Sequence, residues 1–191
     1  KYFFRMDADD ISVRQRLQTQ VDYLSSNPDV SVLGSALDEI NEQGEVVGKR
    51  PLPLEHDEIV KFLPRRCSVN HPTVCIRFSV FEQGFRYRED CKNIEDYFLW
   101  VDLVTHGMKF TNLSDSLLKF RRANDFFVRR GVAKSYTEFQ ARVYAMRKLR
   151  KRNLLNYLYA LSVLVLRVMP ARIIKLAYKI DRKLLQRMVK H

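Results

Sequence analysis

The chain has 191 residues, of which 46% are hydrophobic and 29% charged, so it is long enough and apolar enough to fold around a core. Its three cysteines, Cys67, Cys75 and Cys91, show no Cys-x-x-Cys spacing, which argues against a disulfide framework or a zinc site and fits a reducing compartment. The net charge of +12 is uneven, because residues 1–141 hold 20 Lys/Arg and 21 Asp/Glu whereas residues 142–191 hold 14 Lys/Arg and one acid. This asymmetry indicates an anionic partner, either a membrane surface or a nucleic acid.

A short apolar run at the start predicts a strand that ends in the acidic stretch Arg5-Met6-Asp7-Ala8-Asp9-Asp10. Carboxylates at a strand end suit Mg²⁺ or Mn²⁺, and these ions suit phosphate oxygens. Asp7 and Asp9 need a turn between them to serve one ion, because alternate residues of an extended chain point to opposite sides. The stretch is equally typical of an acidic turn that caps the next helix through Asp10 or Ser12.

Helical and strand patterns alternate along the following residues. In chain order, the periodicity and the Gly and Pro breaks predict a helix over 13–26, strands over 30–37 and 45–48, a helix over 54–63, a strand over 74–77, helices over 78–83 and 93–106, and strands over 109–113 and 116–120. From residue 134 only helical patterns remain, over 134–151, 154–166 and 171–189. The order predicts an α/β sheet followed by an all-helical basic tail.

A second acidic pair, Glu95 and Asp96, opens the predicted helix over 93–106. Acids in a first helical turn are stabilised by the backbone dipole, which is one explanation for the pair. The other is that one of the two is a general base in the drier setting of the aromatic residues that follow. His71 lies in a loop and Trp100 on the same helix as the acids, and each is typical of a structural residue when taken alone.

The basic tail favours a membrane surface over a nucleic acid. The uncharged segment 153–166 is 14 residues long, whereas a span needs roughly 18 to 20, so an in-plane helix fits better than a crossing one. The segment 171–189 is amphipathic and carries aliphatic stripes, whereas nucleic-acid surfaces usually interleave basic residues with exposed aromatics. A helical subdomain packed on the sheet with a solvated basic face remains the alternative.

Residues 1–122 contain an ordered series of short motifs: Arg5-Met6-Asp7-Ala8-Asp9-Asp10, Arg16-Leu17, Gln20-Val21, Asn27-Pro28, Val32-Leu33-Gly34-Ser35, Pro51-Leu52-Pro53, Asn70-His71-Pro72-Thr73-Val74, Gly84-Phe85-Arg86, Glu95-Asp96-Tyr97-Phe98-Leu99-Trp100 and Leu117-Leu118-Lys119-Phe120-Arg121. In this order the motifs resemble the glycosyltransferase family 2 domain, of the type that builds bacterial lipopolysaccharide, capsule and other surface glycans.

The resemblance implies a GT-A fold, a Rossmann-like mixed sheet, of which this chain would hold the C-terminal portion. Residues 1–130 would form a partial catalytic domain and residues 131–191 a helical, basic, membrane-associating region. The first ~90 residues of such a domain, which hold the nucleotide base, have no counterpart here. Because the sequence begins inside an apparent strand and Lys1 is not an initiator residue, we expect the natural chain to extend upstream.

The resemblance also implies the roles of individual residues. Asp9 would be the main ligand of a Mg²⁺ or Mn²⁺ ion on the donor diphosphate, with Asp7 completing the metal shell or facing the ribose. Arg5 and Asp10 would contribute to donor binding. Asp96 would be the base that deprotonates the acceptor hydroxyl, supported by Glu95, and His71 and Trp100 would lie on the acceptor side. Relatives often carry a histidine shortly after the position of Arg121, and its absence here puts a third metal ligand in doubt.

The implied function is inverting, metal-dependent transfer of one sugar from a nucleotide sugar to a glycan or lipid-linked acceptor in cell-surface polysaccharide synthesis. The Gln-x-x-Arg-Trp segment of processive members is absent from the sequence, which favours addition of single sugars. The expected location is the cytoplasm, peripheral at the inner face of the cell membrane, with an anionic membrane surface as a partner. A non-catalytic partner subunit and a basic nucleic-acid-binding module are the alternatives.

Overall fold

The computed structural model describes residues 1–91, 94–122, 132–167 and 169. The elements are β1 (Tyr2–Phe4), β2 (Ile11–Ser12), α1 (Arg16–Ser26), β3 (Val30–Ile40), β4 (Val46–Arg50), α2 (His56–Phe62), the 3₁₀ turn η1 (His71–Thr73), β5 (Cys75–Arg77), α3 (Phe78–Glu82), α4 (Glu95–Thr105), β6 (Lys109–Arg121), α5 (Val132–Lys148) and α6 (Leu154–Arg167). The predicted α/β class with helices after the sheet is confirmed for these residues. The predicted helix over 171–189 lies outside them.

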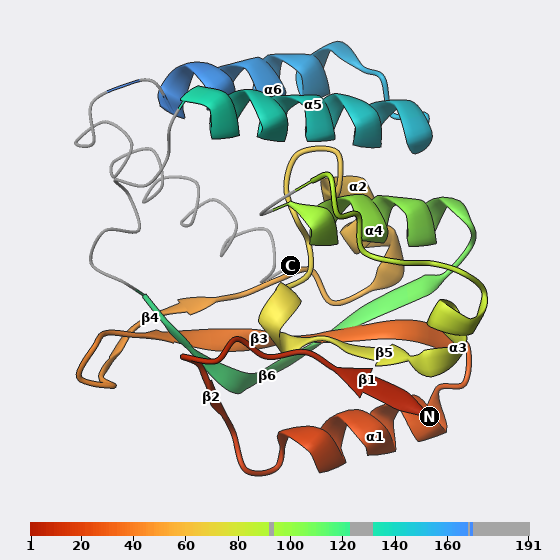
Figure 1. The fold of residues 1–191 in the computed structure, drawn as a ribbon, viewed down its shortest axis with the longest axis vertical. Helices are drawn as coiled ribbons and strands as arrows, with labels where there is room; N and C mark the ends of the chain where they lie inside the picture. Colours follow the sequence, from red (N-terminus) through yellow and green to blue (C-terminus); the bar gives the residue numbers. More distant parts are fainter. Residues whose placement is uncertain (92–93, 123–131, 168, 170–191) are drawn as a thin grey trace.

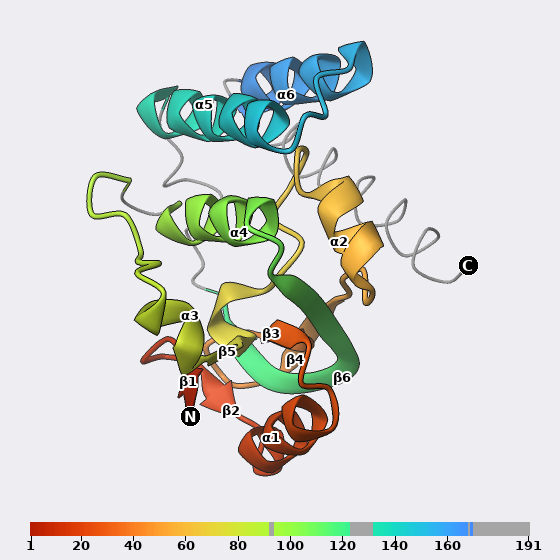
Figure 2. The same cartoon turned by 90° about the vertical axis from the view of Figure 1, so that its right-hand side faces the viewer.

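A mixed sheet forms the centre of the fold, in the order β1-β5-β3-β6-β2, with β4 also paired to β3. β3 and β6 are parallel, and the other pairs are antiparallel. Figure 1 shows α1 on one side of this sheet and α4 on the other, with α5 and α6 stacked beyond α4. Figure 2 shows how strongly β6 curls, so that its last residues reach β2.

The apolar residues divide between the two faces of the sheet. The smaller cluster lies under α1 and holds Leu24, Val30, Leu33 and Cys75. The larger cluster joins α2, α4 and α5 to the opposite face, with Trp100 and Phe110 among its largest members.

The alternative in which Asp10 or Ser12 caps the first helix is wrong. α1 begins at Arg16 after Gln15 and has no side-chain cap, and Ser12 lies in β2 instead.

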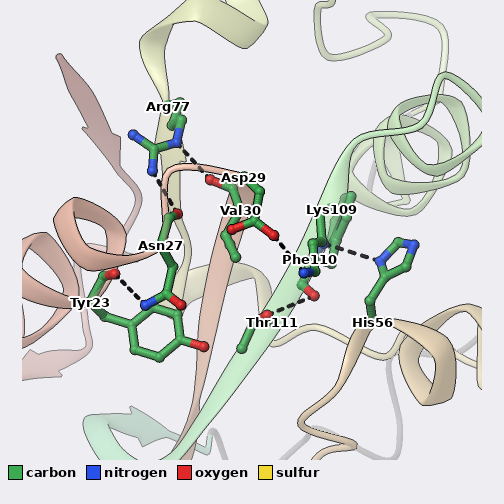
Figure 3. Close-up of polar contacts among 9 residues, drawn as sticks. All are labelled: Tyr23, Asn27, Asp29, Val30, His56, Arg77, Lys109, Phe110 and Thr111. Atoms are coloured by element: carbon green, nitrogen blue, oxygen red, sulfur yellow. Dashed lines mark hydrogen bonds and ion pairs between the residues drawn. The ribbon is translucent and has the colours of Figure 1, made fainter.

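Polar contacts fix the starts of β3 and β6 at the end of the sheet opposite the acidic stretch (Figure 3). The Arg77 guanidinium on β5 donates to the carbonyls of Val30 and Asn27, at 2.6 and 2.9 Å. Lys109 pairs with Asp29, and the Phe110 N–H donates to His56 Nδ1 at 3.2 Å. These contacts hold the two parallel strands in register, so their far ends form a fixed edge of the sheet near the acidic stretch of residues 5–10.

Candidate active site

The acidic stretch of residues 5–10 forms the loop between β1 and β2. The Arg5 N–H continues the pairing to β5 by donating to the Val74 carbonyl at 3.1 Å, and the Asp10 N–H then closes a turn on the Asp7 carbonyl at 3.3 Å. This turn supplies the bend that Asp7 and Asp9 need if both are to bind one ion. Asp7 is half-buried and Asp9 exposed, so both remain reachable from solvent, whereas Asp10 is 7% exposed.

Burial and a hydrogen bond have opposite effects on the pKa of Asp10. Its Oδ1 accepts the Arg121 N–H at 3.0 Å, while Oδ2 has no hydrogen-bond partner among the residues described. Burial raises the pKa of Asp10 to about 6, and the charges of Asp7 and Asp9 act in the same direction. A buried carboxylate oxygen without a partner is an open acceptor for a proton or a cation.

Two arginines anchor the backbone of this loop. The Arg121 guanidinium donates to the Asp9 carbonyl at 3.1 Å and to the carbonyls of Asn41 and Glu42 at 3.0 Å, which ties the loop to the β3–β4 hairpin. Buried Arg16 donates to the Arg5 carbonyl at 2.7 Å. These guanidinium contacts fix where the carboxylates stand.

Asp96 and His71 come together from separate elements. Asp96 is in the first turn of α4, and its Oδ2 lies 4.0 Å from His71 Nδ1, with a side-chain exposure of 20%. The Cys67 thiol contacts the same oxygen at 3.9 Å. Burial raises the pKa of Asp96 to about 6, and the neighbouring Glu95 charge adds to that shift. Asp96 is therefore a carboxylate at neutral pH with a raised proton affinity, as a general base requires.

His71 is a neutral, oriented ring. Its Nε2 lies 3.2 Å from the Tyr87 hydroxyl, and burial together with the charge of Arg5 lowers the pKa of His71 to about 4. Trp100 packs edge-on beneath it, with ring centroids 6.0 Å apart. Trp100 is fully buried, so the predicted acceptor contact of Trp100 is corrected to support of the His71 ring.

Two further residues of this cluster were not found from the sequence. Tyr87 and Cys67 both contact the His71–Asp96 pair, and neither stands in a motif that indicates it. The resembling stretch Gly84-Phe85-Arg86 ends one residue before Tyr87. Glu95 lies beside Asp96, and its Oε2 is buried without a hydrogen-bond partner in the part of the chain described.

Arg5 connects the acidic loop to the Asp96 cluster. Its guanidinium pairs with the Asp7 carboxylate. The same positive charge lowers the pKa of His71 and opposes the upward pKa shifts of Asp96 and Asp10. The charge of Arg5 therefore acts on both acidic groups.

The carboxylates of the loop suit a divalent cation as partial ligands. No group of three His, Cys, Asp or Glu side chains in the described residues forms a complete metal site. Asp7 and Asp9 are hard oxygen donors open to solvent, and Asp10 adds a carboxylate oxygen without a partner. Such a set fits Mg²⁺ or Mn²⁺, which usually binds one or two carboxylates together with waters and phosphate oxygens of a substrate.

The chain is similar to curated glycosyltransferases, although no family model matches it. It is 32% identical to the amylovoran biosynthesis glycosyltransferase AmsE of Erwinia amylovora, over 94% of this chain and 67% of that protein. It is 32% identical to the O-antigen biosynthesis glycosyltransferase WbnJ of Escherichia coli, over 82% of this chain and 60% of that protein. The chain spans between 52% and 67% of the length of these first curated relatives.

A solved structure, S. aureus TarS 1–349 in complex with UDP-GlcNAc, aligns with 90% of this chain and 58% of the TarS chain. The TM-score is 0.48 and the sequence identity 15%. The relationship to AmsE, at 32% identity over two thirds of that protein, is the informative one. On this similarity the chain belongs to the family of glycosyltransferases that includes those of amylovoran and O-antigen biosynthesis.

Proposed function

We propose that this chain carries the acceptor base and the metal-binding loop of an inverting glycosyltransferase, which moves one sugar from a nucleotide sugar to a glycan or lipid-linked acceptor in cell-surface polysaccharide synthesis. The observation that carries the proposal is the Asp96 carboxylate, with its pKa raised to about 6, beside neutral His71 and linked through Arg5 to the acidic loop. Membership of a family with polysaccharide-synthesising members supports the substrate class.

The acidic loop is suited to the diphosphate of the donor. Asp9 and Asp7 would hold a Mg²⁺ or Mn²⁺ ion against the diphosphate oxygens, and Asp10 would complete the negative wall behind them. When bound, such an ion stabilises the negative charge that develops on the departing nucleoside diphosphate. The backbone contacts of Arg121 and Arg16 keep the loop in place before any ligand arrives.

Asp96 is suited to remove the acceptor's proton. In a single displacement, the acceptor oxygen attacks the anomeric carbon from the face opposite the leaving diphosphate, so the configuration inverts. The hydroxyl proton passes to the Asp96 carboxylate as the new C–O bond forms and the bond to the diphosphate breaks. His71, neutral and held by Tyr87, is placed to orient the acceptor with a ring nitrogen, and Glu95 keeps the proton affinity of Asp96 high.

Substitution of Asp96 by Asn tests the base. The chain, expressed with whatever coding sequence precedes Lys1, is assayed for sugar transfer from labelled nucleotide sugars in Mn²⁺ or Mg²⁺. We expect Asp96→Asn to lower kcat by about 100-fold or more, within the usual contribution of a general base. The matched control is Asp57→Asn, an exposed acid that is also in the first turn of a helix, and it should keep full activity. Full activity in Asp96→Asn would refute the assignment.

An anionic membrane surface is the partner we propose for the C-terminal region, residues 131–191. α6 exposes four leucines to solvent, each by 50% or more: Leu154, Leu155, Leu158 and Leu161. The 14 Lys/Arg of residues 142–191 complement anionic headgroups, near which each contributes about 1 kcal/mol at best. In the described residues, no helix combines the length and apolar character that a bilayer crossing requires. An in-plane contact accounts for both features.

A further inference from the structure

Cationic side chains gather around a hollow on the far side of α4 from the acidic loop. The hollow has a volume of about 500 Å³ and lies between α2 and the turn from α5 to α6. None of the described residues that line it is acidic. Five of them are cationic: Lys61, Arg65, Arg150, Lys151 and Arg152. Concentrated positive charge around a concave site attracts an anion and excludes a cation.

Two of these side chains, Arg65 and Lys151, make hydrogen bonds within the protein that shape the hollow, and the other three are open to a ligand. Arg65 Nε donates to Asn156 Oδ1 at 2.8 Å, and Lys151 Nζ donates to the Val60 carbonyl at 3.2 Å, which joins the turn to α2. No ion pair within the described part of the chain engages Lys61, Arg150 or Arg152. These three side chains are therefore available to pair with an anion.

Arg150 occupies a backbone position that usually belongs to glycine. It ends α5 with φ of 55°, and the Lys151 N–H closes the helix on the Met146 carbonyl at 3.0 Å. At the ends of α3 and α4, glycines take the corresponding left-handed conformation. An L-residue with a β-carbon costs about 1 kcal/mol there. The arginine at this position lines the hollow, which a glycine would not do.

The neighbouring lysine shows how closely the charges approach. Burial lowers the pKa of Lys151, the negative charge of Asp57 opposes this shift, and the positive charge of Lys61 adds to it. An anion in the hollow would offset this mutual repulsion. Several guanidinium and ammonium groups around one point match the oxygens of a phosphate, which accept charge-assisted hydrogen bonds from more than one direction.

We propose that this hollow binds a phosphate group. Its volume accepts a phosphate or a diphosphate, and its charge matches a dianion. The group can belong to a soluble phosphate or to a lipid headgroup. The exposed Leu154 and Leu155 directly follow Asn153 in the chain, which offers apolar surface beside the hollow for a lipid source. The site is separate from the acidic loop and stands independently of sugar transfer.

Arg150→Gly provides the sharpest test, because glycine suits the backbone conformation and removes the whole side chain with its charge. Pyrophosphate titrated into the full chain by calorimetry should bind about tenfold more weakly to Arg150→Gly, and more weakly again to Arg150→Gly with Lys61→Gln. The thermal unfolding temperature of Arg150→Gly should be equal to or above that of the wild type. Arg14→Gln, an exposed arginine beside α1, is the control and should bind pyrophosphate as the wild type does.

Vesicle binding distinguishes the two sources. The same variants are mixed with phosphatidylglycerol vesicles and with phosphatidylcholine vesicles. Weaker binding of Arg150→Gly than of Arg14→Gln to the phosphatidylglycerol vesicles identifies a lipid phosphate, and equal binding combined with weaker pyrophosphate binding identifies a soluble one. The proposal is overturned if Arg150→Gly and Arg14→Gln behave alike with both probes, or if the wild type binds neither.

Discussion

Asp96 has a pKa placed for proton removal near neutral pH. Burial raises that pKa to about 6, so the carboxylate is protonated and inactive as a base below this value and ionised above it. We therefore expect kcat/KM for sugar transfer to rise about tenfold per pH unit up to about pH 6 and to level off above it. The measurement is a pH profile at subsaturating acceptor.

Asp10 has a similar pKa, so the two carboxylates must be separated in that profile. Asp10→Asn removes one titrating group and leaves Asp96 unchanged. If the rise near pH 6 persists in Asp10→Asn with its midpoint unmoved, Asp96 is its source. If the rise disappears, the limiting ionisation belongs to the acidic loop.

The raised pKa of Asp10 also predicts how the stability of the fold depends on pH. Its pKa is raised in the folded state, so folding favours the protonated form, and the stability this gives is lost as pH rises from about 4 through about 6. A shift of about two units corresponds to at most about 3 kcal/mol, and solvent screening reduces this to about 1 kcal/mol. Asp10→Asn, which keeps an oxygen for the Arg121 N–H, should unfold at a higher temperature at pH 7.5 and show no gain below pH 4. A gain of the same size at both pH values would contradict the charge explanation.

At the scale of elements, β3 holds the loop that carries His71. Asn70 Nδ2 donates to the Ser35 carbonyl at 3.0 Å, and the Ser35 N–H donates to Thr73 Oγ1 at 3.0 Å. Asn112 on β6 reaches across to the same loop and donates to the Ser68 carbonyl at 2.9 Å. The loop therefore depends on the close approach of β3 and β6.

Gly34 makes this approach possible. A β-carbon there would lie 2.2 Å from Asn112 Oδ1 and 3.0 Å from Val69 Cγ1. Gly34→Ala should therefore lower the free energy of unfolding by about 3 kcal/mol, through overpacking and displaced buried hydrogen bonds. Urea denaturation checks this value. Asn112→Ala is itself destabilising because it removes the hydrogen bond to Ser68, but the double variant should lose less stability than the sum of the two single variants. Strict additivity would show that the two side chains do not collide.

The sequence predicted the elements whose signals are local. Helix periodicity located α1 and α4, and the turn around Gly44 indicated the β3–β4 hairpin. The two strands expected over 109–113 and 116–120 are one strand, β6. Between the two expected strands, the pairing with β3 shifts register, and Ser116 Oγ donates to Asp38 Oδ1 at 2.8 Å. Such a shift depends on a partner strand about 80 residues away in sequence, which local patterns do not contain.

The candidate site was predictable where a motif marks it. The acidic loop, His71, Glu95 and Asp96 each stand in a resembling segment, and the structure pairs His71 with Asp96 and Arg5 with Asp7. Trp100 was placed on the acceptor side by the resemblance, yet its side chain is fully buried in the core. Tyr87 could not be found, because its contact with His71 depends on how a loop folds back over η1.

At the scale of the whole molecule, charge and exposed apolar surface gather at the same end. Residues 1–141 are nearly neutral, while the described residues 142–167 hold seven Lys/Arg and no acid. The hollow at the α5–α6 turn and the exposed leucines of α6 both belong to this end, and Figure 1 shows α6 as the outermost described layer. An anionic bilayer would therefore meet α6 first, leaving the sheet and its acidic loop on the side away from the lipid.

The exposed face of α6 provides the test of this orientation. Leu158→Ser with Leu161→Ser should weaken binding to phosphatidylglycerol vesicles by at least about tenfold, because each leucine contributes roughly 1.5 to 3 kcal/mol when it leaves water. Both side chains are about half exposed, so folding should change little, which thermal unfolding checks. Binding of the wild type should fall at 0.5 M salt and be weak on phosphatidylcholine, since charge supplies part of the attraction. Undiminished flotation of the double variant, combined with tight salt-dependent binding of nucleic acid, would instead favour a nucleic-acid surface.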